Sequence, residues 1–191
     1  MIGNYFLDSC LNSTVINEPW GHQIINDTLP HKDFNTLRKE CERLSVPNDK
    51  LVTIYPKDFN DYNISFYDQI HDISKSILDN ARQLCGKYTN HRWFEDLAVN
   101  AHISVTPPLP YKFYIHQEGL EKIWSSVTYV TPENNVGTKM YTEQKEDTFV
   151  KEAEWKPNST FIFCGQQGKT WHSYESDQTK QRITLNLFLM K

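Results

Sequence analysis

Two segments in the first half of the chain place apolar residues at the spacing of an amphipathic helix. In residues 31–44 these residues recur three and four positions apart, at Phe34, Leu37, Cys41 and Leu44. A longer series in residues 64–86 does the same, with Gly86 as its predicted stop: Phe66, Ile70, Ile73, Ile77, Ala81 and Leu84. Both series predict helices that bury one face. The short run at residues 51–55 between them predicts a strand.

After residue 90 the helical spacing disappears. Short runs of strand-type residues follow one another, separated by turn signals rich in Pro, Gly and Asn. The runs occupy residues 95–106, 111–116, 122–130, 137–143, 147–155, 159–164, 169–175 and 182–190. Strands of this length and spacing predict an antiparallel sandwich or barrel. We therefore expect a mainly β protein with N-terminal helices: a double-stranded β-helix (jelly roll, cupin-like) buttressed by two or three helices.

The length of 191 residues suits one hydrophobic core. Aromatic residues make up 13% of the chain and are spread along it, which is typical of a protein folded throughout. The sequence contains no internal repeat. It predicts a single domain over residues 1–191, in which residues 1–90 form a helical support region and residues 91–191 form the jelly-roll core that carries the site.

Composition narrows the classes of partner. The net charge of −4 and the absence of a Lys/Arg cluster argue against a nucleic-acid partner. The four cysteines lie far apart and without a Cys-x-x-Cys pair, which favours free thiols in a reducing compartment: Cys10, Cys41, Cys85 and Cys164. The N-terminus lacks the features of a signal peptide, and no apolar run is long enough for a membrane span. We expect a cytoplasmic protein that does not enter a membrane.

The first candidate for chemistry is the pair His116 and Glu118. If the strand predicted at residues 111–116 continues through Glu118, the two side chains project from the same face and can chelate one divalent ion. A similar pair, His31 and Asp33, lies at a predicted helix start, where positions two apart do not share a face. Asp33 is better interpreted there as an acid in the first helical turn.

A third ligand is available at His172, in a later strand-like run that a jelly roll can bring beside the first pair. Two histidines and one carboxylate with open positions opposite form the facial triad of non-haem Fe(II) oxygenases. Arg182 and Thr184 follow on one face of the last predicted strand, whose other face carries Leu185, Leu187 and Leu189. A guanidinium beside a hydroxyl is a good receptor for a carboxylate.

This ordered set resembles the His-x-Asp/Glu, His and Arg-x-Ser/Thr signature of the Fe(II)/2-oxoglutarate-dependent dioxygenases. Its three parts here are His116-Gln117-Glu118, His172 and Arg182-Ile183-Thr184. The surrounding segments are similar to the prolyl-4-hydroxylase-like branch, which includes small viral and bacterial members. The resemblance covers nearly the whole chain, in particular residues 18–44, 122–141 and 158–175.

The resemblance implies a role for each matched residue. Fe(II) is then held by His116, Glu118 and His172, and 2-oxoglutarate chelates it and extends its distal carboxylate to Arg182 and Thr184. O2 is the second co-substrate, with ascorbate as a candidate auxiliary reductant. The resemblance also favours Trp124, Ser126 and Thr128 as the inward-facing side chains of the strand at residues 122–130. Thr128 is then a second candidate for binding the distal carboxylate.

Several alternatives stay open. The commoner carboxylate ligand of the family is Asp, whereas this chain has the longer Glu118, so a non-catalytic jelly-roll binding module is one alternative. Another is a cupin-type metal enzyme that does not use 2-oxoglutarate and would not need Arg182. The substrate of a hydroxylase is either a peptidyl residue such as proline or a small molecule. Four further histidines are interpreted as core or surface residues: His22, His71, His91 and His102. Of these, His102 is the one rival candidate for a metal ligand.

Overall fold

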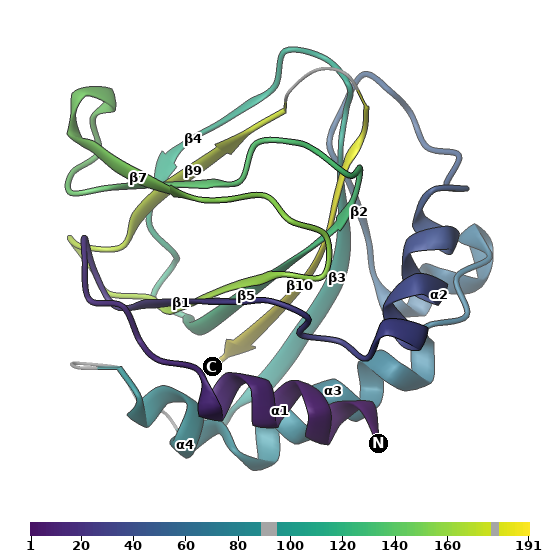
Figure 1. Ribbon diagram of the computed structural model, residues 1–191, viewed down its shortest axis with the longest axis horizontal. Coiled ribbons are helices and arrows are strands. Elements are labelled where there is room, and N and C mark those ends of the chain that lie inside the picture. The colour runs from purple at the N-terminus through teal and green to yellow at the C-terminus, as the bar shows by residue number, and fades with distance from the viewer. Residues whose placement is uncertain (89–94, 177–179) are drawn as a thin grey trace.

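The computed structural model describes residues 1–88, 95–176 and 180–191 (Figure 1). Its helices are α1 (Ile2–Asn12), α2 (His31–Cys41), α3 (Tyr67–Asp79) and α4 (Ala81–Gly86), with short 3-10 turns at Pro56–Tyr62 and Glu146–Thr148. The strands are β1 (His22–Ile25), β2 (Val52–Ile54), β3 (Ala98–Thr106), β4 (Lys112–His116), β5 (Lys122–Thr131), β6 (Thr138–Tyr141), β7 (Phe149–Ala153), β8 (Thr160–Cys164), β9 (Trp171–Glu175) and β10 (Arg182–Met190). All eight strands predicted after residue 90 are present.

The strands form two antiparallel sheets that face each other. The six-stranded sheet has the order β1-β8-β5-β10-β3-β2, and the four-stranded sheet has the order β4-β9-β6-β7. Strands distant in sequence are therefore neighbours: β10, the last strand, lies between β5 and β3. This is the jelly roll that the sequence predicted, with both sheets antiparallel and with helices on one side.

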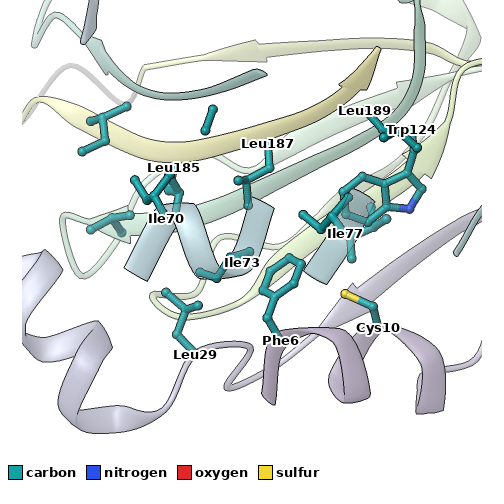
Figure 2. Close-up of a cluster of buried hydrophobic side chains, with 14 of the residues drawn as sticks. Phe6, Cys10, Leu29, Ile70, Ile73, Ile77, Trp124, Leu185, Leu187 and Leu189 are labelled. Atoms are coloured by element: carbon teal, nitrogen blue, oxygen red, sulfur yellow. The ribbon is translucent and has the colours of Figure 1, made fainter. Parts of the chain in front are cut away.

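The helices cover the outer face of the six-stranded sheet (Figure 1). Leu185, Leu187 and Leu189 of β10 point into this layer and are fully buried against the helices. Figure 2 shows them above Ile70, Ile73 and Ile77 of α3, with Phe6 and Cys10 of α1 below. The amphipathic face predicted for residues 64–86 is thus the face that packs on the sheet.

The predicted long helix is two helices. It is interrupted at Asn80, whose backbone leaves helical geometry (φ −116°, ψ 18°) and whose side-chain amide donates to the Ser76 carbonyl oxygen at 2.9 Å. Asn side chains compete for backbone hydrogen bonds in this way, which favours a helix end. The second helix ends at Gly86, as predicted.

Helix α1 was not predicted from the sequence. It packs on α3 through Gly3, whose N–H donates to the Asp72 carboxylate at 2.8 Å. A Cβ at Gly3 would lie 2.4 Å from the Asp72 carbonyl oxygen, so no larger residue fits this crossing without movement. Phe6 and Cys10 are then fully buried. Tertiary packing against α3 explains this helix better than its own propensity.

The region at residues 1–90, expected to be a helical support, also supplies β1 and β2 to the six-stranded sheet. All four cysteines are buried free thiols, as predicted. No helix within the described ranges is long and apolar enough to cross a bilayer.

A second hydrophobic cluster lies between the two sheets and consists of Trp20, Tyr129, Met140, Ala153, Trp155, Phe161 and Phe163. It fills one part of the jelly roll with aromatic rings and leaves the rest of the interior to the site described below.

We expect Leu187→Ala to lower the free energy of unfolding by about 2–5 kcal/mol, because it removes a fully buried side chain between β10 and the helices. The matched control is Leu78→Ala on the solvent side of α3, where the side chain is 41% exposed, and there we expect a change within about 0.5 kcal/mol. Urea denaturation measures both. Equal losses in the two variants would contradict the placement of β10 against the helix layer.

Candidate metal centre and cavity

His116, Glu118 and His172 come together between the two sheets. One possible ligand atom from each residue lies within 4.8 Å of the other two, and the His172 Nε2 atom is 3.9 Å from the Glu118 Oε1 atom. The pairing of β4 with β9 sets His116 directly opposite His172, with the ring centroids 4.2 Å apart. Two imidazoles and one carboxylate at this spacing are a donor set that fits a divalent first-row metal ion.

Both histidines are oriented by backbone carbonyl groups. The Nδ1 atom of His116 lies 3.0 Å from the Tyr114 carbonyl oxygen, and that of His172 lies 2.9 Å from the Thr170 carbonyl oxygen. A carbonyl oxygen only accepts, so Nδ1 carries the proton and donates it. The lone pair is then on Nε2, which is the arrangement of metal-binding histidines held by an outer hydrogen bond.

Glu118 reaches the site from a loop and not from the strand. Strand β4 ends at His116, so the condition that the strand continues through Glu118 is not met. Contacts to the loop that precedes β9 hold the segment instead. The Gln117 amide bonds the Gln167 side chain and the Gly168 N–H at 2.6 Å each, and Gln167 donates to the Glu118 carbonyl oxygen at 3.1 Å.

The Glu118 carboxylate is itself fixed by two neighbours on β5. Lys122 Nζ lies 2.9 Å from Oε2, and the Ser125 hydroxyl donates to Oε1 at 3.3 Å. Oε1 is also the oxygen that faces His172. One oxygen is thus directed toward the metal position while the other is held by an ammonium group.

Burial and charge set the protonation states. Burial, with the nearby imidazole of His116, lowers the pKa of His172 to about 4, and burial also lowers the pKa of His116. Burial opposes ionisation of Glu118, but His172 and Lys122 outweigh it and lower the pKa of its carboxyl group. Near neutral pH the site therefore offers two neutral imidazoles and one carboxylate, the protonation states that metal binding requires.

The triad opens into a cavity of about 200 Å³. Its walls are mostly apolar and aromatic and include Val127, Phe161 and Phe163. Arg182 and Thr184 line it as well and are each only 2% exposed. The sequence prediction that these two residues share a face opposite Leu185 and Leu187 is confirmed.

The Arg182 guanidinium is buried with one nitrogen unsatisfied. Its Nε donates to the Val136 carbonyl oxygen at 3.2 Å, while Nη2 has no hydrogen-bond partner in the part of the chain that the structure describes. Three aromatic rings surround the guanidinium carbon, with centroids at 4.5 Å (Tyr174), 4.9 Å (Trp155) and 5.6 Å (Tyr129). Burial lowers the pKa of Arg182. A buried guanidinium donor without a partner is a receptor for an anion.

Thr128 does not line this cavity. It is fully buried on the helix-facing side of β5, and its hydroxyl shares a 2.7 Å hydrogen bond with Thr160. Trp124 belongs to the same side, as Figure 2 shows. The inward set of β5 is the opposite one, which includes Ser125, Val127 and Tyr129. The expectation that Thr128 faces inward was therefore wrong, because the alternate side chains of β5 are the ones that point into the cavity.

The other histidines that the structure describes lie outside the ligand cluster. His22 is buried, and His31 and His71 are exposed on helices α2 and α3. His91 lies outside the described residues. His102 lines the same cavity as the triad but is not among the clustered ligand atoms, so it is a wall residue of the cavity. Sequence reasoning missed Lys122, Ser125 and the aromatic rings around Arg182, since no spacing rule links them to the triad.

Comparisons with known proteins identify the fold. No protein-family model matches the sequence, and no curated protein matches it. A prolyl hydroxylase from Trichoplax adhaerens was solved with a hypoxia inducible factor peptide and superposes with a TM-score of 0.63 at 11% sequence identity. The match covers 98% of this chain and 88% of the hydroxylase chain. A Pseudomonas putida prolyl-4-hydroxylase gives 0.51 at 16% identity, covering 100% and 99%.

The viral collagen prolyl hydroxylase of Paramecium Bursaria Chlorella virus-1, solved as a 2OG complex, gives a TM-score of 0.55 at 12% identity and covers 92% of this chain and 98% of its own. Identities this low show the fold alone. The chain has a fold like that of these prolyl hydroxylases, with a His-Glu-His cluster inside it.

We expect the metal-free protein to lose stability as the pH falls from about 6.5 toward 4. His102 and His172 have pKa values of about 4 when folded and near 6.5 when unfolded, so the unfolded chain binds protons that the folded chain excludes. Between pH 7 and pH 4.5, His102→Asn should reduce the loss of unfolding free energy by about 2 kcal/mol. Urea denaturation tests this, with His71→Asn on the surface as control. An unchanged pH slope in His102→Asn contradicts it.

A second prediction concerns the length of Glu118. Glu118→Asp shortens the side chain by one methylene and withdraws the carboxylate from Lys122 and Ser125. We expect about 10- to 100-fold weaker binding of Mn(II) or Co(II), because the supporting contacts fit the Glu length. Calorimetric titration measures this, with Glu143→Asp on the surface as control. Equal affinity of Glu118→Asp and the unmodified protein would show that these contacts do not position the ligand.

Proposed function

We propose that this protein is an Fe(II)- and 2-oxoglutarate-dependent oxygenase that hydroxylates its substrate. The observation that carries the proposal is the joint placement of a His-Glu-His cluster and a buried, partly unsatisfied arginine on the walls of one cavity. A metal site alone would not require the arginine. The fold shared with prolyl hydroxylases supports the same conclusion.

In this proposal the chain's residues divide the work of binding. His116, Glu118 and His172 hold Fe(II), and Arg182 and Thr184 hold the distal carboxylate of 2-oxoglutarate. Fe(II), once bound, supplies the activation of O2, by which one oxygen atom enters a substrate C–H bond and the other enters succinate as CO2 is released. Phe161, Phe163 and Val127 exclude water from the reacting groups.

Arg182 suits a dicarboxylate for a physical reason. The guanidinium is buried, and its contacts within the described residues are aromatic faces and one carbonyl oxygen. A carboxylate that accepts from Nη2 offsets the cost of burying the charge and forms a charge-assisted hydrogen bond. The Thr184 hydroxyl, two residues along the same strand face, is a further donor.

Two observations bear on the substrate class. One structural neighbour was solved with a peptide, which supports a peptidyl residue of the prolyl type. A small molecule is the second candidate, because the cavity is only about 200 Å³. The four buried free thiols support a reducing, cytoplasmic location as part of the same proposal.

The proposal is tested by conversion of 2-oxoglutarate to succinate with Fe(II), O2 and ascorbate. We expect conversion by the unmodified protein and none by His172→Ala, which loses a metal ligand. Arg182→Ala should raise the KM for 2-oxoglutarate by about 10- to 100-fold, because a charge-assisted contact is lost. Arg43→Ala, an exposed arginine, is the matched control and should change neither.

Two other outcomes would overturn the proposal in different ways. Metal binding without 2-oxoglutarate binding, unaffected by Arg182→Ala, indicates a cupin-type metal enzyme. Absence of metal binding indicates a jelly-roll binding module without catalysis. Calorimetric titration with Mn(II) and then with 2-oxoglutarate separates these outcomes without relying on turnover.

A further inference from the structure

The end of the cavity away from Arg182 carries an additional positive charge. Its wall contains Lys122, Phe188, His102 and Asn186, and Ser104, which pairs with Thr184, contacts this wall through Asn186. Lys122 Nζ lies 2.9 Å from the Glu118 carboxylate and 3.9 Å from the centroid of the Phe188 ring. The ammonium is therefore held in place by an anion and an aromatic face, and it remains 26% exposed.

The charges at this end do not cancel once the proposed site is loaded. Among the cavity-lining residues that the structure describes, the charged ones are Glu118, Lys122 and Arg182. At the Arg182 end of the cavity, the positive charge of Arg182 is balanced by the distal carboxylate of 2-oxoglutarate. At the metal end, a divalent ion and Lys122 bring three positive charges, against one negative charge from Glu118 and one from the 1-carboxylate of 2-oxoglutarate.

One positive charge is thus left beside the metal position. His102 does not change this balance, because burial and the nearby Lys122 lower its pKa to about 4 and keep its ring neutral. An excess charge in a partly buried cavity is unfavourable unless a ligand of opposite sign enters. The remaining polar groups of this wall are neutral and include Asn186, whose amide donates to the Ser104 hydroxyl at 2.8 Å.

We propose that Lys122 is a specificity-determining residue and that the substrate carries a carboxylate, which binds between Lys122 and the Asn186–Ser104 wall. This inference rests on the proposed function and narrows its substrate class. The oxidised carbon lies near the carboxylate group, because Lys122 Nζ is 2.9 Å from the metal-binding side chain of Glu118. The carboxylate belongs either to a small acid or to the terminus of a peptide.

The wall beside Lys122 agrees with such a substrate. The centroid of the Phe188 ring lies 3.9 Å from Lys122 Nζ and offers an apolar face there. A small acid with a short apolar body can therefore place its carboxylate on Lys122 and its carbon chain against this ring.

The test uses the full chain with Zn(II), which is redox-inert, and 2-oxoglutarate. The probes are matched pairs that differ only in charge: butanoate and butanamide, 3-methylbutanoate and 3-methylbutanamide, benzoate and benzamide. A fourth pair, N-acetyl-trialanine with a free or an amidated C-terminus, separates a peptide source from a free acid. Ligand-observed NMR titration measures each affinity.

We expect the carboxylate of at least one pair to bind about tenfold more tightly than its amide to the unmodified protein and to Lys122→Arg. This preference should disappear in Lys122→Gln and persist in Lys169→Gln, an exposed lysine outside the cavity. Absence of a carboxylate preference in all four pairs, or its persistence in Lys122→Gln, overturns the inference.

Affinities for Zn(II) and 2-oxoglutarate are measured first in every variant. Failure of the unmodified protein to bind both refutes the proposed function itself. Binding of both without a carboxylate preference refutes only the role of Lys122 in specificity. If Lys122→Gln weakens 2-oxoglutarate and leaves probe binding unchanged, Lys122 is a co-substrate ligand and the inference is wrong.

Discussion

Strand β10 separates two environments, and the rest of the molecule depends on that separation. Its alternate residues point to opposite faces of the sheet. Leu185, Leu187 and Leu189 pack against the helices, which buries one face without polar groups. The intervening residues, which include Arg182 and Thr184, must then point between the sheets. The hydrophobic contact with the helices therefore fixes the direction of the polar side chains as firmly as any contact within the site.

Ionisable side chains are gathered in the buried space between the two sheets. Arg182 is buried among aromatic rings with an unsatisfied donor, and the triad histidines have pKa values lowered by burial. A buried unsatisfied donor favours binding of an anion, and neutral imidazoles favour binding of a cation. Under the proposed function these groups define which ligands the cavity accepts, and Lys122 adds a third ligand.

Side-chain contacts fix the position of the Glu118 carboxylate, because Glu118 lies in a loop and not in a strand. Two glutamines from different loops bond to one another, and the β5 residues Lys122 and Ser125 hold the carboxylate. The longer side chain of Glu118 is therefore matched by its supports. The carboxylate faces His172, so this structure accommodates the length of the Glu side chain at the cluster.

The sequence by itself determined the parts of this protein that depend on local periodicity. The helical spacing of residues 64–86, the short strands after residue 90 and the two-residue alternation of β10 follow from which neighbours a repeating backbone places on one face. So does the grouping of Arg182 with Thr184. The order of the motifs indicated His116, Glu118 and His172 as candidate ligands, and the structure brings these three side chains together.

Only the tertiary structure decided which face of β5 turns inward, because strand alternation allows either face to do so. Thr128 lies on the face that turns toward the helices. Helix α1, the break at Asn80 and the loop position of Glu118 likewise depend on contacts between segments distant in sequence. The aromatic rings around Arg182 and the ammonium of Lys122 reach the cavity from separate strands. Spacing along the chain cannot reveal such neighbours, since the sheet pairing and the packing of the two sheets bring them together.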